Sequence, residues 1–538
     1  MTLEDHKTAR RWTFAWGVLG GVIIASLAFT PLAFWLGRGD AGSEATTTTV
    51  AAFDGAVAGR PAGDFFLDTC SGCHGADRRG ATGPALLPER LSQDASYYVG
   101  VITDGKPGTV MPSFASSPYN LTPDDISTLV EFIHTESSEG PPNWTFADTA
   151  ASLTVLTPED QLPAAPTHRG NLENLLLVTE RETQSIAVID GDTDQVLTHI
   201  PASYRAHGYT YSPTDERWAY NMGRDGWVFK IDLYSLQPVR KIRIGLDSRA
   251  IAISDDGRYL IAGNYVPASL VILDAATLEP LKVYGTSALD PDGELIDSRV
   301  ATILDVSPDL VGPYFLVALK EAGQVWRIDW SDPDFPITAV SDVGHILHDG
   351  FLSPDNATFY LASQNDNWMA AIDVRTMSVV ARIGTGDKPH PGSGAAWEVD
   401  GVTYGATVHA AEGKGAIWNL ETNEIVGTVP TAGAGLFLRA SENSPYVWAD
   451  SVFAEEPHSI TVFEKAPPFR VVGTITDGIR TLHPEFSADG QKVYISDWDG
   501  GVVRVYDANT LELLTEITGI DNPTGIFDSS RRKETLGH

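Results

Sequence analysis

Cysteine and positive charge are both scarce in this chain. Its 538 residues include only two cysteines, Cys70 and Cys73, so a framework of disulfides cannot support the fold. Lysine and arginine number 37 against 71 aspartates and glutamates, which gives a net charge of −34. This balance argues against nucleic-acid binding, which needs basic surfaces. It is typical of a surface adapted for solubility or high salt, and it would also attract a basic partner protein.

The two cysteines belong to one short motif, Cys70-Ser71-Gly72-Cys73-His74. C-x-x-C-H is the attachment signature of a c-type haem, in which the thiols bind the porphyrin and the histidine binds the iron. A bare redox dithiol does not require the histidine, and a zinc site would need further cysteines. The motif therefore predicts covalent haem c with His74 as an iron ligand.

A second iron ligand is expected further along the chain. Met111 lies 37 residues after His74, and the chain has only five methionines. Its Met-Pro loop resembles the axial-ligand loop of class I cytochromes c. The alternatives are a packing methionine at 111 and His134 as the ligand. We predict Met111, because His134 falls in the following helix.

The surrounding residues are those of a small helical domain. Gly83-Pro84 resembles the cytochrome c loop whose proline carbonyl accepts a hydrogen bond from the ligand histidine, a bond that fixes the orientation of the ring. Thr122 and Pro123 are typical of a helix start, and apolar residues follow with helical spacing. We predict an all-α class I cytochrome c domain over residues 60–138.

The N-terminus contains a long apolar run. Residues 14–36 carry no charge over 23 positions, which is long enough to span a bilayer. Lys7, Arg10 and Arg11 precede the run, and the positive-inside rule then places everything after it outside the cytoplasm. The alternative is a cleaved signal peptide. We predict a cytoplasmic tail and transmembrane anchor over 1–38, a flexible tether over 39–59, and a single-pass location in the cytoplasmic membrane with the later domains on the periplasmic or extracellular side.

The remaining residues contain an internal repeat. An apolar alternation that ends in an acid or asparagine recurs eight times, at spacings of 42 to 55 residues. A period of 40 to 50 with strand-like units is typical of β-propeller blades, and helical solenoids fit worse because helical periodicity is absent. The longest spacing indicates an insertion near Asp290–Ser298. We predict a mainly β chain with an eight-bladed β-propeller over 171–530, a linker over 139–170 that wraps along it, and a tail over 531–538. The eight copies are Ser185–Asp190, Trp227–Asp232, Ser269–Asp274, Gln324–Asp329, Trp368–Asp373, Gly415–Asn419, Ser459–Glu464 and Val502–Asp507.

Together, haem c and an eight-bladed propeller resemble the cytochrome cd1 family, which includes nitrite reductase and its relatives in haem d1 biosynthesis. Arg205-Ala-His207-Gly-Tyr209 is similar to the family motif whose histidine is the proximal ligand of haem d1. His348-Asp-Gly350 and Pro389-His390-Pro-Gly392 are similar to the loops that supply its distal histidines. The resemblance implies non-covalent haem d1 on His207, with His348 and His390 in the distal pocket.

Haem d1 carries several carboxylates, and its pocket therefore needs cations. Arginine suits this task because its planar guanidinium binds carboxylates in a bidentate manner. The resemblance assigns five cations, each in a separate blade, to this pocket. They are Arg205, Arg224, Arg249, Arg299 and Lys320. His409 is similar to a further family histidine and is predicted either to line the pocket or to face a loop.

Two activities follow from the resemblance. The first is reduction of nitrite to nitric oxide, with His348 and His390 as proton donors. The second is oxidation of a haem d1 precursor, as in dihydro-haem d1 dehydrogenase, with His483 as the candidate base; His483 stands where the reductases are expected to have glycine. We predict nitrite reduction, with the dehydrogenase as the alternative, and a propeller that only binds proteins as a third class. The implied partners are nitrite or a d1 precursor, a periplasmic electron-transfer protein and a possible second copy of the chain.

Overall fold

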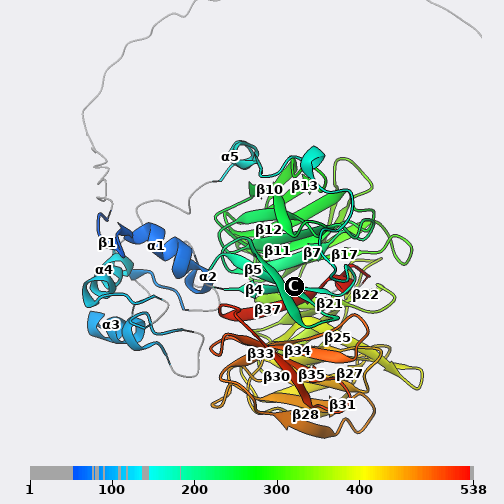
Figure 1. Cartoon of the computed structure of the whole chain (residues 1–538). Helices are drawn as coiled ribbons and strands as arrows, with labels where there is room; N and C mark the ends of the chain where they lie inside the picture. The colour runs from blue at the N-terminus through cyan, green and yellow to red at the C-terminus, as the bar shows by residue number, and fades with distance from the viewer. Residues whose placement is uncertain are drawn as a thin grey trace, which may run out of the picture. The chain divides into compact units, whose positions relative to one another are not determined.

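The computed structural model describes most of the chain from residue 53 onward. Figure 1 shows the ribbon with its helices and strands labelled. The described residues are 53–75, 78, 84–88, 91, 93–106, 111–116, 119–135, 144–181 and 183–533.

The first described domain is helical. Its helices are α1 (Ala62–Thr69), α2 (Ser71–His74), α3 (Ala95–Asp104) and α4 (Pro123–Ile133), with a small pair of strands, β1 (Ala56–Val57) and β2 (Arg60–Pro61). The start of α4 is a capping box in which Thr122 and Asp125 satisfy each other's backbone N–H groups, with Pro123 at the first position. The predicted helix start is therefore confirmed. The apolar face of α4 packs into a core with Phe65 and Phe114.

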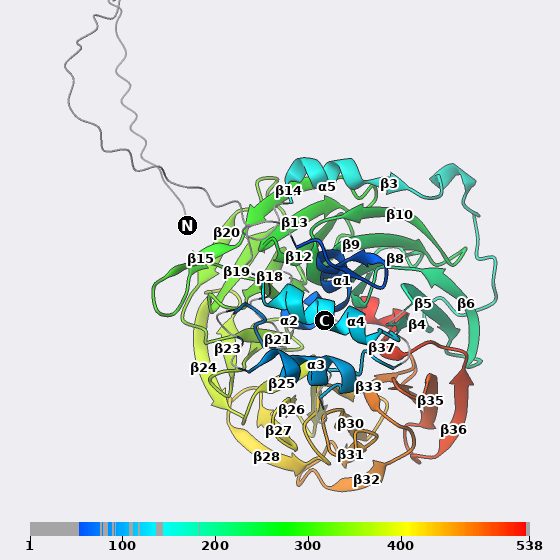
Figure 2. The ribbon, with the colours of Figure 1, turned by 90° about the vertical axis from the view of Figure 1, so that its left-hand side faces the viewer.

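Eight antiparallel sheets follow, arranged in a ring (Figure 2); seven have four strands, and that of the second blade has a fifth, outer strand. The innermost strands are β37 (Pro523–Asp528), β7 (Ala206–Tyr211), β11 (Asp247–Ile253), β17 (Val300–Val306), β21 (Leu347–Leu352), β25 (Pro389–Val399), β29 (Leu438–Ala440) and β33 (Thr481–Phe486). The second strands are β4 (Leu175–Glu180), β8 (Trp218–Gly223), β12 (Tyr259–Val266), β18 (Tyr314–Leu319), β22 (Thr358–Ser363), β26 (Val402–His409), β30 (Tyr446–Asp450) and β34 (Lys492–Asp497).

The third and fourth strands complete each blade. The third strands are β5 (Ser185–Asp190), β9 (Trp227–Asp232), β13 (Ser269–Asp274), β19 (Gln324–Asp329), β23 (Trp368–Asp373), β27 (Lys414–Asn419), β31 (Ile460–Glu464) and β35 (Val502–Asp507). The outermost strands are β6 (Gln195–Pro201), β10 (Gln237–Arg243), β14 (Pro280–Gly285), β20 (Ile337–Val340), β24 (Ser378–Gly384), β28 (Ile425–Pro430), β32 (Val471–Ile475) and β36 (Leu513–Thr518). The eight blades of the prediction are confirmed, and each sequence repeat is the third strand of its blade. The predicted insertion is the hairpin of β15 (Ser287–Leu289) and β16 (Leu295–Asp297).

The acid that ends each repeat has a local structural role. The backbone N–H of Thr277 donates to Asp274 at 2.8 Å, and that of Thr510 donates to Asp507 at 2.7 Å. Asn419 accepts in the same way from the turn that follows it. An Asp or Asn side chain that accepts from the backbone two or three residues later stabilises a tight turn. The repeat therefore records the turn between the third and fourth strands of each blade.

The core of the propeller lies between neighbouring blades. One cluster joins Ile261 and Leu270 of the third blade to Phe315 and Trp326 of the fourth. Because each sheet packs against a blade on both faces, its middle strands are buried on both sides and are almost continuously apolar in sequence. Burial of apolar surface at every junction is the main force that closes the ring.

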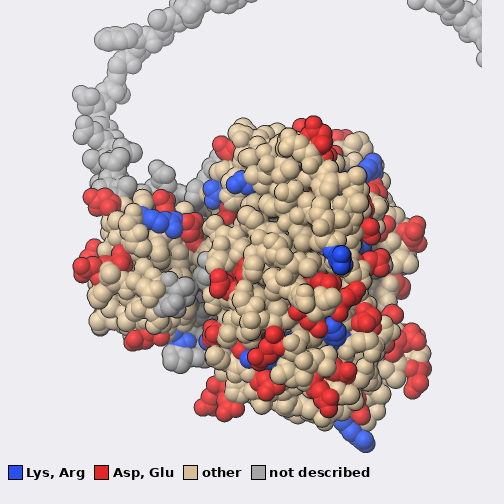
Figure 3. Space-filling view, in the orientation of Figure 1, with Lys and Arg blue, Asp and Glu red and all other residues tan. Residues whose placement is uncertain are grey.

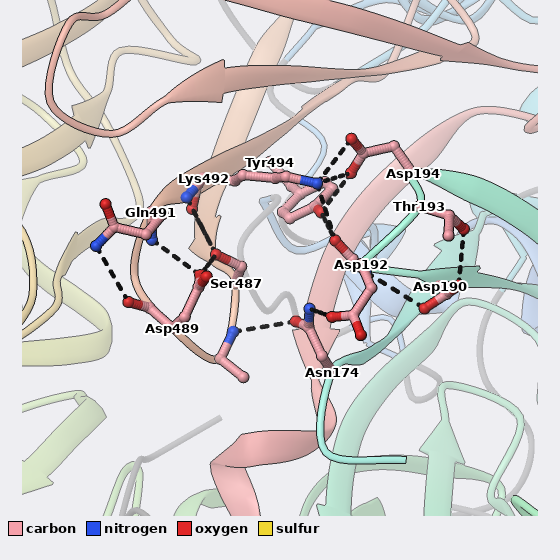
Figure 4. A network of polar contacts seen from close by, with 12 residues as sticks. Asn174, Asp190, Asp192, Thr193, Asp194, Ser487, Asp489, Gln491, Lys492 and Tyr494 are labelled. Carbon is pink, nitrogen blue, oxygen red and sulfur yellow. Dashed lines mark hydrogen bonds and ion pairs between the residues drawn. The ribbon is translucent and has the colours of Figure 1, made fainter. Parts of the chain in front are cut away.

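The ring closes where the last blade meets the first. β37, near the end of the chain, pairs with β4 in the first blade. A polar network supports this junction (Figure 4): Lys492 Nζ lies 2.8 Å from Asp194 Oδ2, and Tyr494 donates to Asp194 Oδ1 at 2.6 Å. The backbone N–H of Ala488 also donates to Asn174 at 3.0 Å. The end of the chain thus supplies the innermost strand of the first blade, which joins the two ends of the ring.

The segment between the two domains follows the propeller where it is described. It contains α5 (Phe146–Ser152), β3 (Thr154–Val155) and a short 3₁₀ helix, η2 (Glu159–Gln161). β3 extends the second blade by pairing with β10, and Trp144 donates to the carbonyl of Arg243 at 3.2 Å. The described chain ends in a second 3₁₀ helix, η3 (Ser529–Lys533).

The expectation of a membrane anchor needs correction. Within the described ranges, none of the helices combines the length and the apolar character needed to cross a bilayer. The longest of them, α4, has 11 residues, whereas a spanning helix needs about 20. The predicted transmembrane helix, and the single-pass membrane location that depended on it, are contradicted. Residues 14–36, to which the prediction referred, lie outside the described residues.

Candidate functional site

A cavity of about 480 Å³ surrounds the C-x-x-C-H motif. Cys70, Cys73 and His74 line it, and Met111 also contributes to its wall. The Nδ1–H of His74 donates to the carbonyl of Pro84 at 2.8 Å, as predicted. This bond fixes the ring and leaves the lone pair on Nε2, the arrangement that an iron ligand requires. The residues present therefore fit haem c.

The alternatives for this motif fit the structure less well. Burial raises the pKa of the Cys70 thiol to about 12, whereas a reactive redox thiol needs a lowered pKa. His134 donates its Nδ1–H to the carbonyl of Val130 at 2.7 Å, and its ring packs against Tyr98. His134 is not among the residues that line the cavity, which favours Met111 as the second ligand.

Arg205 lies at this cavity and not with the other predicted d1-binding cations. Its guanidinium donates to the carbonyl of Thr69 and to the hydroxyl of Tyr119, both at 3.0 Å. Both acceptors belong to the cytochrome c domain. Arg205 thus binds the two domains together, and it stands two residues before His207 in the chain.

His207 repeats the arrangement found at His74. It lies on the innermost strand β7, and its Nδ1–H donates to the carbonyl of Arg249 at 3.1 Å. Because the proton is on Nδ1, the lone pair is on Nε2. A histidine that binds metal usually has its other ring nitrogen held in this way. The geometry fits the predicted role of His207 as a d1 ligand.

The other four predicted cations gather around one buried tyrosine, Tyr265 of β12. The expectation that each of the five cations lies in a separate blade is wrong, because Arg205 and Arg224 both adjoin strands of the second blade, and Arg299 and Lys320 both adjoin strands of the fourth. The guanidinium carbons of Arg224 and Arg299 lie 4.6 and 4.9 Å from the ring centroid of Tyr265. Arg249 and Lys320 are close enough to contribute to the electrostatic lowering of its pKa. Each arginine also has an acidic partner: Asp247, Asp349 and Glu321, respectively, bind Arg224, Arg249 and Arg299. The cluster is a cationic wall suited to the carboxylates of a tetrapyrrole.

The two predicted distal histidines meet at a buried aspartate. The rings of His348 and His390 are 4.6 Å apart. Asp349 lies 3.1 Å from His348 Nδ1, 3.5 Å from His390 Nε2 and 2.8 Å from the Arg249 guanidinium. Burial lowers the pKa of both imidazoles, that of His348 strongly, and this effect outweighs the opposing attraction of Asp349. Both histidines are therefore neutral near pH 7.

We also asked whether His348, Asp349 and His390 could hold a metal ion. One possible ligand atom from each residue lies within 4.8 Å of the others, and no other group in the described part of the chain meets this condition. The Arg249 guanidinium already binds the carboxylate of Asp349. A metal cation would have to share this carboxylate with a buried positive charge, which is unfavourable. The arrangement fits proton exchange better than metal binding.

His483 lies between two aromatic rings on the opposite side of the ring of blades. Its ring centroid is 4.3 Å from that of Phe437 and 5.1 Å from that of Phe527. The backbone N–H of Ile526 donates to its Nδ1 at 3.3 Å, which puts the imidazole proton on Nε2. In this tautomer His483 presents a hydrogen-bond donor through Nε2 and does not accept a proton there.

Residues on and next to the innermost strands thus come together from most of the blades. The cations around Tyr265 and the pair of histidines meet at Arg249, whose guanidinium lies 2.8 Å from Asp349 and 3.5 Å from the His348 ring. His409 is not part of this group. It is buried, and its Nδ1–H donates to the carbonyl of Lys414 at 2.9 Å within its own blade. Of the two alternatives for His409, this contact favours a local role at a loop over a place in the pocket.

Asp450 is a buried carboxyl group that binds the segment carrying His483. Its burial leads us to expect that the stability of the fold depends on pH. Its carboxylate accepts from the backbone N–H groups of Leu436 at 2.7 Å and His483 at 3.1 Å. Burial raises the pKa of Asp450 to about 6, above its value of about 3.9 in an unfolded chain. The native state therefore binds this proton more tightly, and the resulting stability is present below pH ~4 and lost as the pH rises through ~6.

As the pH rises from about 4 through about 6 and above, we expect the free energy of unfolding of the unmodified protein to fall by about 3 kcal/mol relative to that of Asp450→Asn. Urea unfolding at several pH values measures the difference. Asp342→Asn, at a carboxylate whose side chain is 88% exposed, is the matched control. Equal slopes for Asp450→Asn and the unmodified protein would contradict the prediction.

Sequence reasoning missed two residues of this site. Asp349 directly follows His348 in the motif His348-Asp-Gly350, so the sequence could have indicated that it belongs to the same site. Tyr265 belongs to no recognised motif, and only the approach of four cations from other strands distinguishes it from any buried tyrosine.

Comparison with known proteins agrees with this fold and site. Residues 170–532 match the family model of the cytochrome D1 heme domain, and residues 58–133 match that of the cytochrome C oxidase, cbb3-type, subunit III. The first match covers more than half of the chain, which therefore belongs to the cytochrome d1 family. The resemblance inferred from the sequence is confirmed. The chain is a cytochrome cd1-type oxidoreductase, and haem c and haem d1 are its cofactors.

Three relatives show where the chain stands within this family. It is 31% identical over 486 residues to dihydro-heme d1 dehydrogenase of Pseudomonas aeruginosa, covering 88% of this chain and 94% of the relative. It is 29% identical over 519 residues to nitrite reductase of Stutzerimonas stutzeri, covering 86% and 91%. The solved structure of dihydro-heme d1 dehydrogenase NirN in complex with DHE matches with a TM-score of 0.72 and 30% identity, over 88% of this chain and 99% of that one.

Proposed function

We propose that this protein oxidises dihydro-haem d1 to haem d1. In this reaction a propionate side chain, –CH2–CH2–COO⁻, becomes an acrylate, –CH=CH–COO⁻, and releases two protons and two electrons. The electrons leave one at a time and pass to an external acceptor. When bound, haem c supplies the one-electron acceptor within the protein.

The direction of proton flow carries this proposal. Reduction of nitrite to nitric oxide consumes two protons for each electron, and its site must hold groups that donate protons. His348 and His390 are neutral, because burial lowers the pKa of each. Each has its Nδ1–H bound within the protein, to Asp349 and to the Leu436 carbonyl, respectively. Neutral imidazoles bound in this way have no proton that they readily deliver near pH 7, which disfavours nitrite reduction and leaves the dehydrogenation as the better-supported activity.

The similarity to known proteins supports the same choice. The relative named as a dihydro-heme d1 dehydrogenase is matched over 94% of its length. The solved structure that bears this name was obtained with DHE, and the chain covers 99% of it. His483, the departure from the reductase pattern, is buried at the site and presents a hydrogen-bond donor.

The proposed roles follow from the geometry. Cys70 and Cys73 attach haem c, and His74 and Met111 bind its iron. His207 binds the iron of the tetrapyrrole in the propeller. The side-chain carboxylates of the tetrapyrrole bind to four cations, and three histidines face it. The cations are Arg224, Arg249, Arg299 and Lys320; the histidines are His348, His390 and His483.

We further propose that the domain over 60–138 exchanges electrons and that the propeller over 171–530 holds the substrate. Arg205 joins the two through its bonds to Thr69 and Tyr119. The external acceptor is proposed to be a basic electron-transfer protein. The surface in Figure 3 carries far more acidic than basic area, in line with the net charge of −34, and such a field attracts a positively charged protein.

Reduction of nitrite is the second candidate. Two observations favour it: the nitrite reductase of Stutzerimonas stutzeri is 29% identical over nearly the same span, and the paired histidines that the reductases use are both present, 4.6 Å apart.

One preparation can decide between the two activities. The protein with haem c receives dihydro-haem d1 and an oxidised one-electron acceptor, and its absorption spectrum reports formation of haem d1. In parallel, the reduced protein loaded with haem d1 receives nitrite, and an electrode reports nitric oxide. We expect formation of haem d1 and no sustained production of nitric oxide. Sustained nitric oxide that is lost on His348→Ala or His390→Ala would establish the reductase instead.

A further inference from the structure

The cavity around the C-x-x-C-H motif is not formed by the cytochrome c domain alone. Cys70, Cys73 and His74 line one part of it, and residues of the propeller line another. Besides Arg205, which binds the two domains together, the propeller residues at this cavity are Arg181, Arg480, Trp498, Asp499 and Asn522. The site of haem c therefore spans both domains.

These propeller residues come from the place where the ring of blades closes. Arg480 directly precedes β33, and Trp498 directly follows β34, both in the last blade. Arg181 directly follows β4, and Asn522 directly precedes β37, both in the first blade. The side-chain amide of Asn522 donates to the carbonyl of Trp498 at 3.3 Å. This bond joins the loops of the two blades.

Trp498 contacts two guanidinium groups. The guanidinium carbon of Arg181 is 4.7 Å from the centroid of the indole ring, and that of Arg480 is 5.5 Å from it. Cations at these distances are attracted to the face of an aromatic ring. We call Arg181, Arg480 and Trp498 the Trp498 cluster. It places one large aromatic ring and two positive charges at the haem c cavity.

The backbone around the Trp498 cluster is held by the propeller itself. The carboxylate of Asp497 is completely buried, and it accepts from the backbone N–H groups of Ile479 at 3.1 Å and Arg480 at 2.9 Å. The backbone N–H of Trp498 donates to the carbonyl of Arg480 at 2.8 Å. The position of the cluster is thus fixed by the last blade and does not depend on contact with a haem.

The propeller side of the cavity carries net positive charge. Its described residues include three arginines and one carboxylate, that of Asp499. Asp499 lies 3.0 Å from Arg480, but its side chain is 43% exposed, and water screens a charge exposed to this degree. The positive charge also acts on the attachment site: burial raises the pKa of the Cys70 thiol, and the nearby charge of Arg205 opposes this rise.

Positive charge and the exclusion of water have the same effect on a haem. Oxidation adds one positive charge to the iron, so nearby cations favour the reduced form. A surrounding of low dielectric also favours the reduced form, which carries less charge, and burial is one of the means by which proteins set haem potentials. The indole of Trp498 supplies the exclusion of water, and the two guanidinium groups supply the charge.

We propose that the Trp498 cluster is part of the haem c site and that it raises the reduction potential of haem c. The propeller thereby sets a property of a cofactor attached to the other domain. Under the proposed function, a higher potential makes haem c a better acceptor for the electrons released at the propeller. The inference itself needs only haem c, and it applies to either of the two candidate activities.

An equilibrium redox titration tests this proposal without turnover. The protein is prepared with haem c and without haem d1, and its absorption reports the ratio of oxidised to reduced haem c at each applied potential. We expect the midpoint potential to fall by about 60 mV or more in Trp498→Ala, which is a tenfold change in this ratio. Arg181→Gln combined with Arg480→Gln should lower it by a similar amount.

Matched variants separate the two causes. Trp498→Phe keeps an aromatic ring at the cavity, so its potential should fall less than that of Trp498→Ala. Arg181→Lys combined with Arg480→Lys keeps both charges and should fall less than the glutamine pair. Trp368→Ala and Arg382→Gln each change a similar pair in the fifth blade, where the guanidinium carbon is 5.6 Å from the indole centroid. Neither residue lines the cavity, and both variants should titrate as the unmodified protein does.

The proposal is overturned if Trp498→Ala and the double glutamine variant both keep the midpoint potential of Trp368→Ala. Circular dichroism and the spectrum of the attached haem show whether each variant is folded. If Trp498→Ala does not fold, the double glutamine variant decides the question, because it leaves the indole in place. The measurement uses protein without haem d1, so a failure of the proposed function would not change its result.

Discussion

Replacement of both attachment cysteines, Cys70 and Cys73, by alanine is expected to reduce turnover of dihydro-haem d1 to background. Without the two thiols, haem c cannot be attached, and the electrons released at the propeller have no acceptor within the protein. Binding of dihydro-haem d1 should stay within about threefold, because the cations proposed to hold it belong to another domain and distant sites act independently. Absorption spectra report both the loss of haem c and the binding of the tetrapyrrole.

Ser71→Ala is the matched control for this experiment. It changes the same short helix, α2, and leaves both sulfur atoms in place, so haem attachment and turnover should persist. An artificial one-electron oxidant that restores turnover to the double cysteine variant would place the defect at the electron acceptor. Full turnover by the double variant without such an oxidant would show that the substrate is oxidised by a route that does not need haem c.

Removal of the Asp349 carboxylate is expected to have the largest effect on stability. Asp349 is completely buried and lies 2.8 Å from the Arg249 guanidinium, whose side chain is 6% exposed. Asp349→Ala leaves this guanidinium buried without its counter-charge, which typically costs about 3–5 kcal/mol. Urea unfolding of the protein without haem d1 measures the loss. Dihydro-haem d1 should recover part of it, since its carboxylates supply negative charge to the same wall.

Two further variants test the cause of this loss. Asp349→Leu combined with Arg249→Met replaces the ion pair by apolar groups of similar volume and should recover most of the stability, although not the binding of the tetrapyrrole. Asp342→Ala breaks the exposed pair with Arg382, whose atoms are 3.0 Å apart, and should cost less than about 1 kcal/mol. Equal losses for Asp349→Ala and Asp342→Ala would mean that Asp349 is not balancing a buried charge.

The two histidines proposed to bind haem iron show how much a local sequence pattern can predict. His74 and His207 both stand in short motifs, and in both the structure pins Nδ1 to a backbone carbonyl, at 2.8 and 3.1 Å. For His74 the support is also local, because Pro84 follows ten residues later. The carbonyl that binds His207 belongs to Arg249, 42 residues away, and no pattern in the sequence indicates that contact.

Arg205 illustrates the opposite case. Its motif placed it with the d1-binding cations, but its side chain points to the cytochrome c domain and binds Thr69, 136 residues earlier in the chain. A residue next to a predicted ligand in the sequence need not lie at the same site. Which way its side chain points depends on the packing of two domains, and a sequence motif does not encode that packing.

The sequence by itself determined the number of blades and their order, and it predicted the attachment site of haem c. These features depend on local rules: a fixed spacing of two thiols and a histidine, and an Asp or Asn that closes the same turn in most blades. Only the tertiary structure decided that Asp349 joins His348, His390 and Arg249, and that four cations surround Tyr265. The packing of neighbouring blades brings these side chains together from the second to the sixth blade, and their burial then shifts their pKa values.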